Sequence, residues 1–138
     1  MKIGIIGCGN ISSIYLNNLT KHFTNTEVYA ICDLDEKKAK AQAEKFGIER
    51  IFTLEQMLSC PEIQLILNIT TPQTHYSLCK ESRLAGKHAY VEKPLSLTYA
   101  QGKELVELAE EKGLYFGCAP DTFWAPASRP PLTQSKKA

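Results

Sequence analysis

Short apolar segments alternate with longer amphipathic segments along most of this chain. The apolar segments are rich in Ile, Val and Leu, which is typical of strands buried on both faces of a sheet. They predict strands at residues 2–6, 28–32, 65–69, 88–91 and 115–117, and one further brief strand at 50–52. The amphipathic segments predict helices at 11–21, 35–46, 74–85 and 99–112, with a short helical piece at 54–59.

Several of these helices carry recognisable start and stop signals. Asp35 can cap the helix that starts there, and Gly47 follows the last apolar residue of that helix. Thr74 can cap the helix that ends before Gly86, and Gly113 follows the last helix. The boundaries of the helices are therefore predicted by two independent features, the apolar period and the caps.

The regular alternation of strands and helices predicts β-α-β units. We therefore expect an α/β fold, with a doubly wound, mainly parallel sheet of about six strands and helices on both faces. The pattern stops near residue 123. Residues 124–138 show no periodicity and hold three of the seven prolines, so we expect one domain over 1–123 followed by an irregular tail.

The charge balance bears on the choice of partners. Sixteen Lys and Arg against fifteen Asp and Glu leave a net charge of +1, which offers no electrostatic reason to expect nucleic acid or an anionic membrane. Lys37, Lys38 and Lys40 alternate with acids and indicate an ordinary solvated helix face. Because the chain also lacks an apolar run of about 18 residues and a good signal peptide, we expect a cytoplasmic protein.

The cysteines are odd in number and scattered, and they form no C-x-x-C pair. They stand at Cys8, Cys32, Cys60, Cys79 and Cys118. Disulfide and metal frameworks need closer or paired spacing, so we expect unpaired thiols in a reducing compartment and no metal site.

The first strand runs directly into a glycine turn, which is the strongest functional signal in the chain. The turn reads Gly7-Cys8-Gly9-Asn10-Ile11-Ser12 and fits the pattern G-x-G-x-x-S. Gly7 would make the tight turn, Gly9 would let the backbone touch a pyrophosphate, and Ser12 replaces the third glycine of the dinucleotide fingerprint. We expect Asn10 and Ile11 to lie against the same pyrophosphate at a helix N-terminus. A turn that uses glycine only for its conformation is the alternative.

An acidic residue follows the second predicted strand, about 20 positions beyond the glycine motif, as the fingerprint requires. This residue is Asp33. Its carboxylate can accept hydrogen bonds from the adenosine ribose and repel a 2′-phosphate, so we expect NAD rather than NADP as the cofactor. A residue that merely ends a strand is the alternative.

Two later segments follow predicted strands and would lie at the same edge of the sheet. In the first, Thr71 and His75 flank Pro72 and offer polar contacts near a ribose. In the second, Glu92 precedes Lys93, which can donate a hydrogen bond to a substrate hydroxyl or carbonyl. A capped turn in the first case and a surface lysine in the second are the structural alternatives.

Five segments in this order resemble the Gfo/Idh/MocA family of sugar dehydrogenases, which includes glucose–fructose oxidoreductase and inositol dehydrogenase. They are G-C-G-N-I-S, the Asp33 position, N-I-T-T-P-Q-T-H, A-Y-V-E-K-P-L-S and G-C-A-P-D-T-F, and together they reach from Met1 to Phe123. The resemblance implies a Rossmann domain that binds NAD or NADP.

The resemblance also implies roles for the residues at the sheet edge. Thr71, Pro72 and His75 would line the nicotinamide ribose, and Glu92 and Lys93 would lie at the reaction edge, with Lys93 as the catalytic candidate. Family members continue with a second domain that supplies most of the sugar or polyol site, and this chain is expected to lack it. We therefore expect cofactor binding without appreciable dehydrogenase activity unless a second domain is supplied.

The irregular tail has a specific explanation under this resemblance. Relatives often read Leu-Gly-Ala-Gly-Leu-Gln-Thr-Ala after the Asp-Thr-Phe segment. With suitable codons, loss of one base turns that octapeptide into Trp-Ala-Pro-Ala-Ser-Arg-Pro-Pro, which stands at 124–131. The hypothesis is an out-of-frame tail after a one-base frameshift. A domain without its partner would also expose apolar surface, so a self-associating or partner-binding module is the alternative function.

Overall fold

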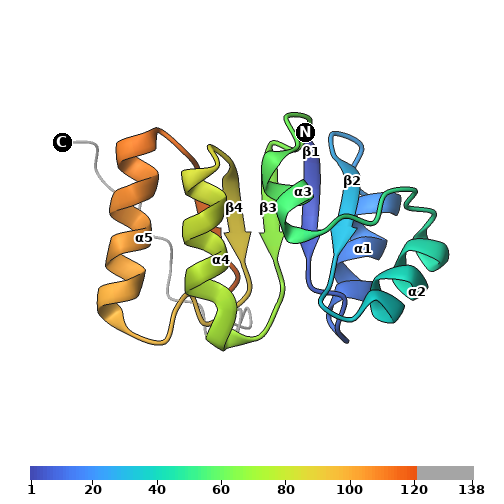
Figure 1. The fold of residues 1–138 in the computed structure, drawn as a ribbon, viewed down its shortest axis with the longest axis horizontal. Helices are drawn as coiled ribbons and strands as arrows, with labels where there is room; N and C mark the ends of the chain where they lie inside the picture. The colour runs from blue at the N-terminus through green and yellow to red at the C-terminus, as the bar shows by residue number, and fades with distance from the viewer. Residues whose placement is uncertain (121–138) are drawn as a thin grey trace, which may run out of the picture.

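A five-stranded parallel sheet forms the centre of the molecule. The computed structural model describes residues 1–120, so the predicted tail and the last residues of the predicted domain lie outside the described part. The strands, in the spatial order β2-β1-β3-β4-β5, are all parallel (Figure 1). Their bounds are Lys2–Ile6 for β1, Glu27–Cys32 for β2, Leu65–Asn68 for β3, His88–Val91 for β4 and Phe116–Cys118 for β5.

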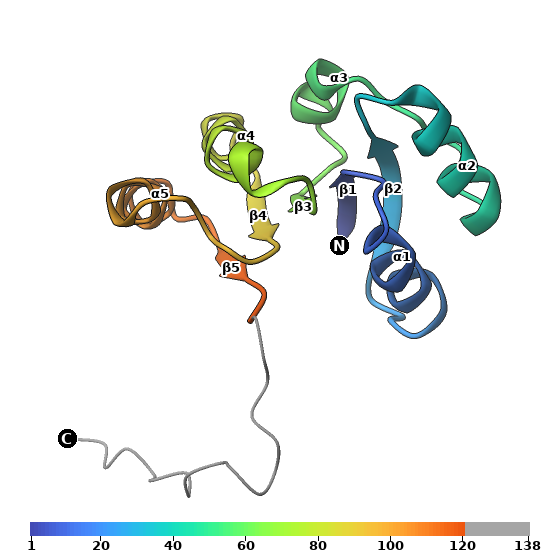
Figure 2. The same cartoon turned by 90° about the horizontal axis from the view of Figure 1, so that it is seen from below.

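Helices cover both faces of the sheet, as the alternating pattern predicts. They are α1 (Ser12–Lys21), α2 (Glu36–Phe46), α3 (Leu54–Ser59), α4 (Pro72–Leu84) and α5 (Tyr99–Lys112). The helices α1 and α2 lie on one face, and α3, α4 and α5 lie on the other (Figure 2). The doubly wound Rossmann architecture is confirmed.

Alternate strand residues supply the apolar cores on the two faces. On one face, Ile5 and Leu67 pack with Leu16 of α1 and Ala39 of α2. On the other face, one core gathers around Met57 of α3, and a second forms between α4, α5 and β4. Burial on both faces explains why the central strands read as nearly continuous apolar runs.

The number of strands is smaller than predicted. The brief strand expected at 50–52 is reduced to a single parallel bridge between Ile51 and Ile31 of β2. This bridge occupies the outer position next to β2, so within residues 1–120 the sheet has five strands and a single bridge in place of the sixth. Ile51 is exposed, and an edge segment with little apolar burial has little to hold it in a longer ladder.

The caps confirm one helix boundary and correct another. The Asp35 side chain accepts a hydrogen bond from the N–H of Lys37, and Gly47 ends α2 in the left-handed conformation at φ 68°. The predicted cap at Thr74 is wrong, because α4 already begins at Pro72 and has Thr71 at its N-cap. A proline is favoured in the first helical turn, where its missing N–H has no intrahelical partner.

Candidate functional site

The carboxyl ends of the strands lie in one row across the sheet. Ile6 of β1 pairs with Cys32 of β2 and with Asn68 of β3, and Asn68 pairs with Val91 of β4. The chain leaves β1 toward β2 on one side and later returns to β3 on the other, so the strand order reverses between β1 and β3. In open α/β sheets, ligands bind at such a switch point, outside the carboxyl ends of the strands.

A cleft of about 510 Å³ opens at this switch point. Six of the sequence-predicted site residues line it: Gly7, Gly9, Asn10, Ile11, Asp33 and Thr71. Leu34 and Lys38 line its β2 end, while Thr70, Thr74 and Leu78 line the β3 side. Ser12, Pro72, His75, Glu92 and Lys93 are not among the lining residues. The structure thus brings together the glycine turn, the acid after β2 and the turn after β3.

The surroundings of the two glycines in the turn differ. Gly7 adopts φ 107°, and a Cβ placed there would approach the carbonyl oxygen of Ile69 to 2.7 Å. Its N–H also donates to the carbonyl of Cys32 at 2.8 Å. A Cβ at Gly9, in contrast, would meet no atom within 4 Å. Packing of the protein therefore requires a glycine at Gly7, whereas the bare backbone at Gly9 faces open space in the cleft.

Ser12 and Asp33 hold the turn in shape. The buried Ser12 hydroxyl donates to the carbonyl of Gly9 at 2.6 Å. One carboxylate oxygen of Asp33 accepts the N–H of Cys8 at 2.7 Å, and the other accepts the N–H of Asp35 at 2.7 Å. Each carboxylate oxygen can accept more than one hydrogen bond, so Asp33 retains acceptor capacity toward the cleft.

The thiol of Cys8 lies behind the glycine turn, where it is 4% exposed. Burial raises its pKa to about 12, and the nearby charge of Asp33 adds to the effect. The thiol therefore stays protonated and unreactive at neutral pH, since the thiolate is the nucleophilic form.

Two helix N-termini point at the cleft without side-chain caps. Within residues 1–120, the side chains of Asp35, Thr53 and Thr98 cap α2, α3 and α5. The N-cap residues of α1 and α4, Ile11 and Thr71, make no such bond. Both belong to the cleft lining, so the partial positive charge of two helices is directed at this space.

Polar side chains brace the turn after β3. The buried Asn68 amide donates to the carbonyl of His75 at 3.3 Å, and its oxygen accepts the Thr70 hydroxyl at 2.6 Å. The Thr70 and Thr74 hydroxyls are 2.7 Å apart, and Thr74 also donates to the carbonyl of Thr71. The sequence analysis did not include Asn68 among the site residues, although a polar residue at the end of an apolar strand was a usable signal.

His75 lies beneath the cleft surface. Its side chain is 1% exposed. The Nδ1 atom is 2.7 Å from the carbonyl oxygen of Pro94, and the Nε2 atom is 3.0 Å from that of Thr70. The ring therefore joins the turn after β3 to the turn after β4. In this arrangement it is directed at backbone carbonyls.

Glu92 begins the turn after β4. Its carboxylate accepts hydrogen bonds from the Tyr15 hydroxyl and, at 3.1 Å, from the N–H of Lys93. Its own N–H donates to the carbonyl of Asn68. Burial and the hydrogen bond to Glu92 raise the pKa of Tyr15 above its ordinary value. Lys93 is exposed at the same edge of the sheet.

Lys38 lines the cleft beside Asp33 and Leu34. The sequence interpretation placed it on an ordinary solvated face, because its neighbours alternate in charge. Lys38 is exposed, as that interpretation predicts, and it also lines the cleft. No simple sequence pattern separates Lys38 from Lys37 and Lys40.

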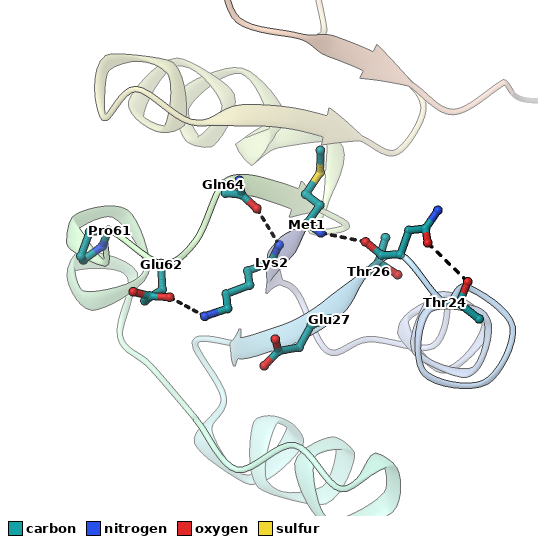
Figure 3. A pocket seen from close by; sticks show the side chains of 9 residues that line it. Met1, Lys2, Thr24, Thr26, Glu27, Pro61, Glu62 and Gln64 are labelled. Atoms are coloured by element: carbon teal, nitrogen blue, oxygen red, sulfur yellow. Dashed lines mark hydrogen bonds and ion pairs between the residues drawn. The ribbon is translucent and has the colours of Figure 1, made fainter.

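A second hollow, of about 570 Å³, lies at the opposite, amino end of the strands (Figure 3). An ion pair between Lys2 and Glu62 crosses it, and the amide oxygen of Gln64 accepts the N–H of Lys2. The terminal ammonium of Met1 donates to the carbonyl of Asn25. These polar groups are paired, whereas the buried hydroxyl of Thr26, which also lines the hollow, has no hydrogen-bond partner among the described residues. The hollow lies away from the edge where α/β sheets bind ligands.

A known protein family shares this architecture. Residues 1–119 match the model of the Gfo/Idh/MocA oxidoreductase family, described as having an NAD-binding Rossmann fold. The chain belongs to this family.

Curated relatives carry dehydrogenase names. The chain is 32% identical over 127 residues to D-apiose dehydrogenase of Paraburkholderia graminis, covering 91% of this chain and 34% of the relative. It is 33% identical over 108 residues to myo-inositol 2-dehydrogenase of Thermotoga maritima, covering 78% of this chain and 32% of the relative. The chain therefore spans about a third of the length of these relatives.

A solved structure shares the fold and part of the sequence. Biliverdin reductase of Synechocystis, solved with biliverdin and NADP+, superposes with a TM-score of 0.78 at 30% identity, covering 85% of this chain and 37% of that one. Of the helices in residues 1–120 of the present chain, none is long and apolar enough to cross a membrane.

Proposed function

We propose that this chain binds NAD(H) in the cleft at the switch point, as the cofactor half of an oxidoreductase that acts on a sugar or polyol. One observation carries the proposal. The uncapped N-termini of α1 and α4 and the bare backbone of Gly9 converge on one cleft. An anionic pyrophosphate is the group that such an arrangement accommodates, because it supplies acceptors for unpaired N–H groups.

The order of the strand ends supports one direction for the bound cofactor. The adenosine would lie at the β2 end, where Asp33 can accept from the ribose hydroxyls, and the pyrophosphate would lie over Gly9. The nicotinamide would then extend over the turn with Thr71 and Pro72, toward Glu92 and Lys93 after β4. The register of the strand ends supports this order.

The β2 end favours NAD over NADP. A 2′-phosphate would meet the carboxylate of Asp33, which the N–H groups of Cys8 and Asp35 hold in place. Asp35, two positions later in sequence, adds a second negative charge, whereas Lys38 is the one cation among the described lining residues. Like charges held at short distance disfavour binding of the phosphate.

The reaction edge of the proposed site lies at the turn that carries Lys93. A bound nicotinamide ring accepts or donates a hydride, and Lys93 would donate a hydrogen bond to the substrate oxygen at the reaction edge. The sugar or polyol class rests on the names of the dehydrogenase relatives. Because the chain spans about a third of their length, we expect it to bind cofactor without appreciable turnover, since hydride transfer needs both reactants held in register.

Titration of the chain with NADH and NADPH, followed by nicotinamide fluorescence, tests the proposal. Saturable binding of NADH, weakened at least about tenfold for NADPH by the charge at the β2 end, is the expected result. Absence of saturable binding for both nucleotides contradicts the proposal.

Self-association is a second candidate function, favoured by one surface. Leu97, Tyr99 and Val106 line a shallow groove beside α5 and are exposed, Tyr99 by 85%. Exposed apolar side chains that lie together favour association. A molar mass that rises with concentration in sedimentation equilibrium, and that falls back in Tyr99→Ser, would support this candidate.

A further inference from the structure

Two side chains outside the cleft lining meet the turn that carries Lys93. We propose that Tyr15 and His75 are positioning residues that fix the Glu92-Lys93-Pro94 turn from its two sides, and so set the nicotinamide end of the site. The link to the nicotinamide rests on the proposed function, whereas the fixing of the turn rests on the contacts alone.

Tyr15 holds the first residue of the turn. Its hydroxyl donates to the Glu92 carboxylate across 77 positions of sequence, and the second oxygen of that carboxylate accepts the N–H of Lys93. The raised pKa of Tyr15 keeps the hydroxyl protonated at neutral pH, so it remains a donor. A hydrogen bond to an ionised carboxylate is stronger than one between neutral groups. The helix that follows the glycine turn is thereby tied to the start of the lysine turn.

His75 holds the last residue of the turn. Its Nδ1 atom is 2.7 Å from the carbonyl oxygen of Pro94, and the opposite nitrogen faces the carbonyl of Thr70 at 3.0 Å. Carbonyl oxygens only accept, so the ring donates through the nitrogen that carries the proton, and the tautomer decides which of the two carbonyls accepts. With the side chain 1% exposed, water does not replace a lost contact easily. The end of the lysine turn is thus tied to the turn that lines the cleft.

The two contacts act on the same short segment from different helices. Tyr15 reaches it from α1, and His75 reaches it from α4. Because Lys93 stands between the two anchored residues, the freedom of its backbone depends on both. Residues that hold a reacting group in place can lie away from the substrate and still control its position.

Hydrogen exchange in the nucleotide-free chain tests the anchoring directly. Tyr15→Phe should speed exchange of the amides at 92–96 about tenfold, the effect of losing one charge-assisted hydrogen bond. The matched control is Tyr76→Phe, which removes a tyrosine–glutamate bond between α4 and α5 at Glu104. Tyr76→Phe should leave the exchange rates of the amides at 92–96 unchanged.

Paired variants at His75 separate its two contacts. The amide nitrogen of glutamine extends to about the place of Nε2, and that of asparagine to about the place of Nδ1. His75→Gln should therefore lose the bond to Pro94 and speed exchange at 92–96, whereas His75→Asn should protect this segment better. Equal exchange in the two variants, or an unchanged rate in Tyr15→Phe, overturns the anchoring.

Nucleotide affinities test the link to the nicotinamide end. ADP-ribose lacks the nicotinamide, so it senses only the other half of the site. In Tyr15→Phe and His75→Gln, NADH should bind about tenfold more weakly, while ADP-ribose should change less than about twofold. Equal losses for both ligands indicate general destabilisation and overturn this link. If the unaltered chain binds neither NADH nor ADP-ribose, the proposed function fails. The exchange experiment then still tests whether Tyr15 and His75 anchor the turn.

Discussion

Asp33 accepts a hydrogen bond from the backbone N–H of Cys8 at 2.7 Å, across 25 positions of sequence. The carboxylate that the dinucleotide fingerprint assigns to a ribose is thus also part of the glycine turn itself. Its other oxygen accepts the N–H of Asp35 and connects the end of β2 to the start of α2. A single side chain therefore shapes two walls of the cleft before any ligand is present.

Replacement of Asp33 should accordingly affect both folding and binding. Asp33→Ala leaves two backbone N–H groups without their acceptor, which should lower the free energy of unfolding by about 1 kcal/mol, given the partial exposure of the site. Asp33→Asn keeps an amide oxygen and should recover part of that loss. Urea unfolding measures this effect. If Asp33→Ala is as stable as the unaltered chain, the carboxylate does not support the turn.

The two glycines of the turn should respond in opposite ways to a methyl group. Gly7→Ala forces a Cβ to within 2.7 Å of the Ile69 carbonyl oxygen at φ 107°, so it should unfold at a clearly lower temperature, by about 2 kcal/mol or more. Gly9→Ala has open space around the new Cβ and should melt normally. It should nevertheless weaken NADH binding about tenfold or more, because the methyl group would stand where the pyrophosphate approaches.

Thermal melting and NADH titration of the two variants check this pair of predictions. Normal nucleotide affinity in Gly9→Ala would mean that the pyrophosphate does not lie over this residue. A normal melting temperature in Gly7→Ala would contradict the steric explanation of the turn.

The buried thiol of Cys8 predicts a loss of stability at alkaline pH. Its folded pKa of about 12 lies above the ordinary value of 9.0, so above pH 9 the unfolded chain releases a proton that the folded chain retains. The contribution of the Cys8 thiol to the free energy of unfolding is complete below pH 9 and is lost progressively toward pH 12. At pH 10 the loss amounts to about 1 kcal/mol.

Cys8→Ala removes this contribution, so the comparison isolates it from the other titrating groups. The difference in unfolding free energy between the unaltered chain and Cys8→Ala should shift by about 1 kcal/mol between pH 8 and pH 10, with the unaltered chain losing more. A difference that stays constant with pH would show that the thiol titrates alike in both states.

The environment of Arg83 predicts that an apolar residue at this position would stabilise the fold. Its side chain is fully buried, its guanidinium lies 3.7 Å from the ring centre of Phe116, and within the described residues none of its three nitrogens has a hydrogen-bond partner. Desolvation lowers its pKa. A buried charge without a polar partner costs several kcal/mol, which the contact with the ring offsets only in part.

Arg83→Met keeps an unbranched apolar chain against Phe116 and removes the charge. It should raise the free energy of unfolding by about 1 kcal/mol or more, measured by urea unfolding. The control is Arg50→Met, which removes a guanidinium that packs on Tyr29 from a partly exposed position and should not stabilise the chain. Destabilisation by Arg83→Met would show that the guanidinium has a favourable role in the fold.

Local patterns predicted most elements of the fold. The helices Leu54–Ser59 and Tyr99–Lys112 and the strands Lys2–Ile6 and His88–Val91 have the predicted bounds. These boundaries depend on the periodicity of apolar residues and on the helix caps. Both are determined by residues that are close together in the sequence. The start of α4 was misplaced because Pro72 and Thr74 both offer plausible beginnings. The brief strand at 50–52 is reduced to one bridge because its edge position buries little apolar surface.

The sequence by itself determined the class of fold, the glycine turn and the acid after β2. Each of these depends on residues close together in the chain: the alternation of apolar and amphipathic segments, and the spacing of a strand, two glycines and a carboxylate. Such local features can be predicted from the sequence because backbone conformation and burial periodicity are determined over a few residues.

Only the tertiary structure decided how the candidate residues are used. It placed Lys38 in the cleft, turned His75 toward two backbone carbonyls and paired Glu92 with Tyr15. These arrangements arise where the ends of separate strands meet, between residues up to 77 positions apart. Contacts over such separations depend on how the sheet is assembled, and the linear order of residue types does not specify them.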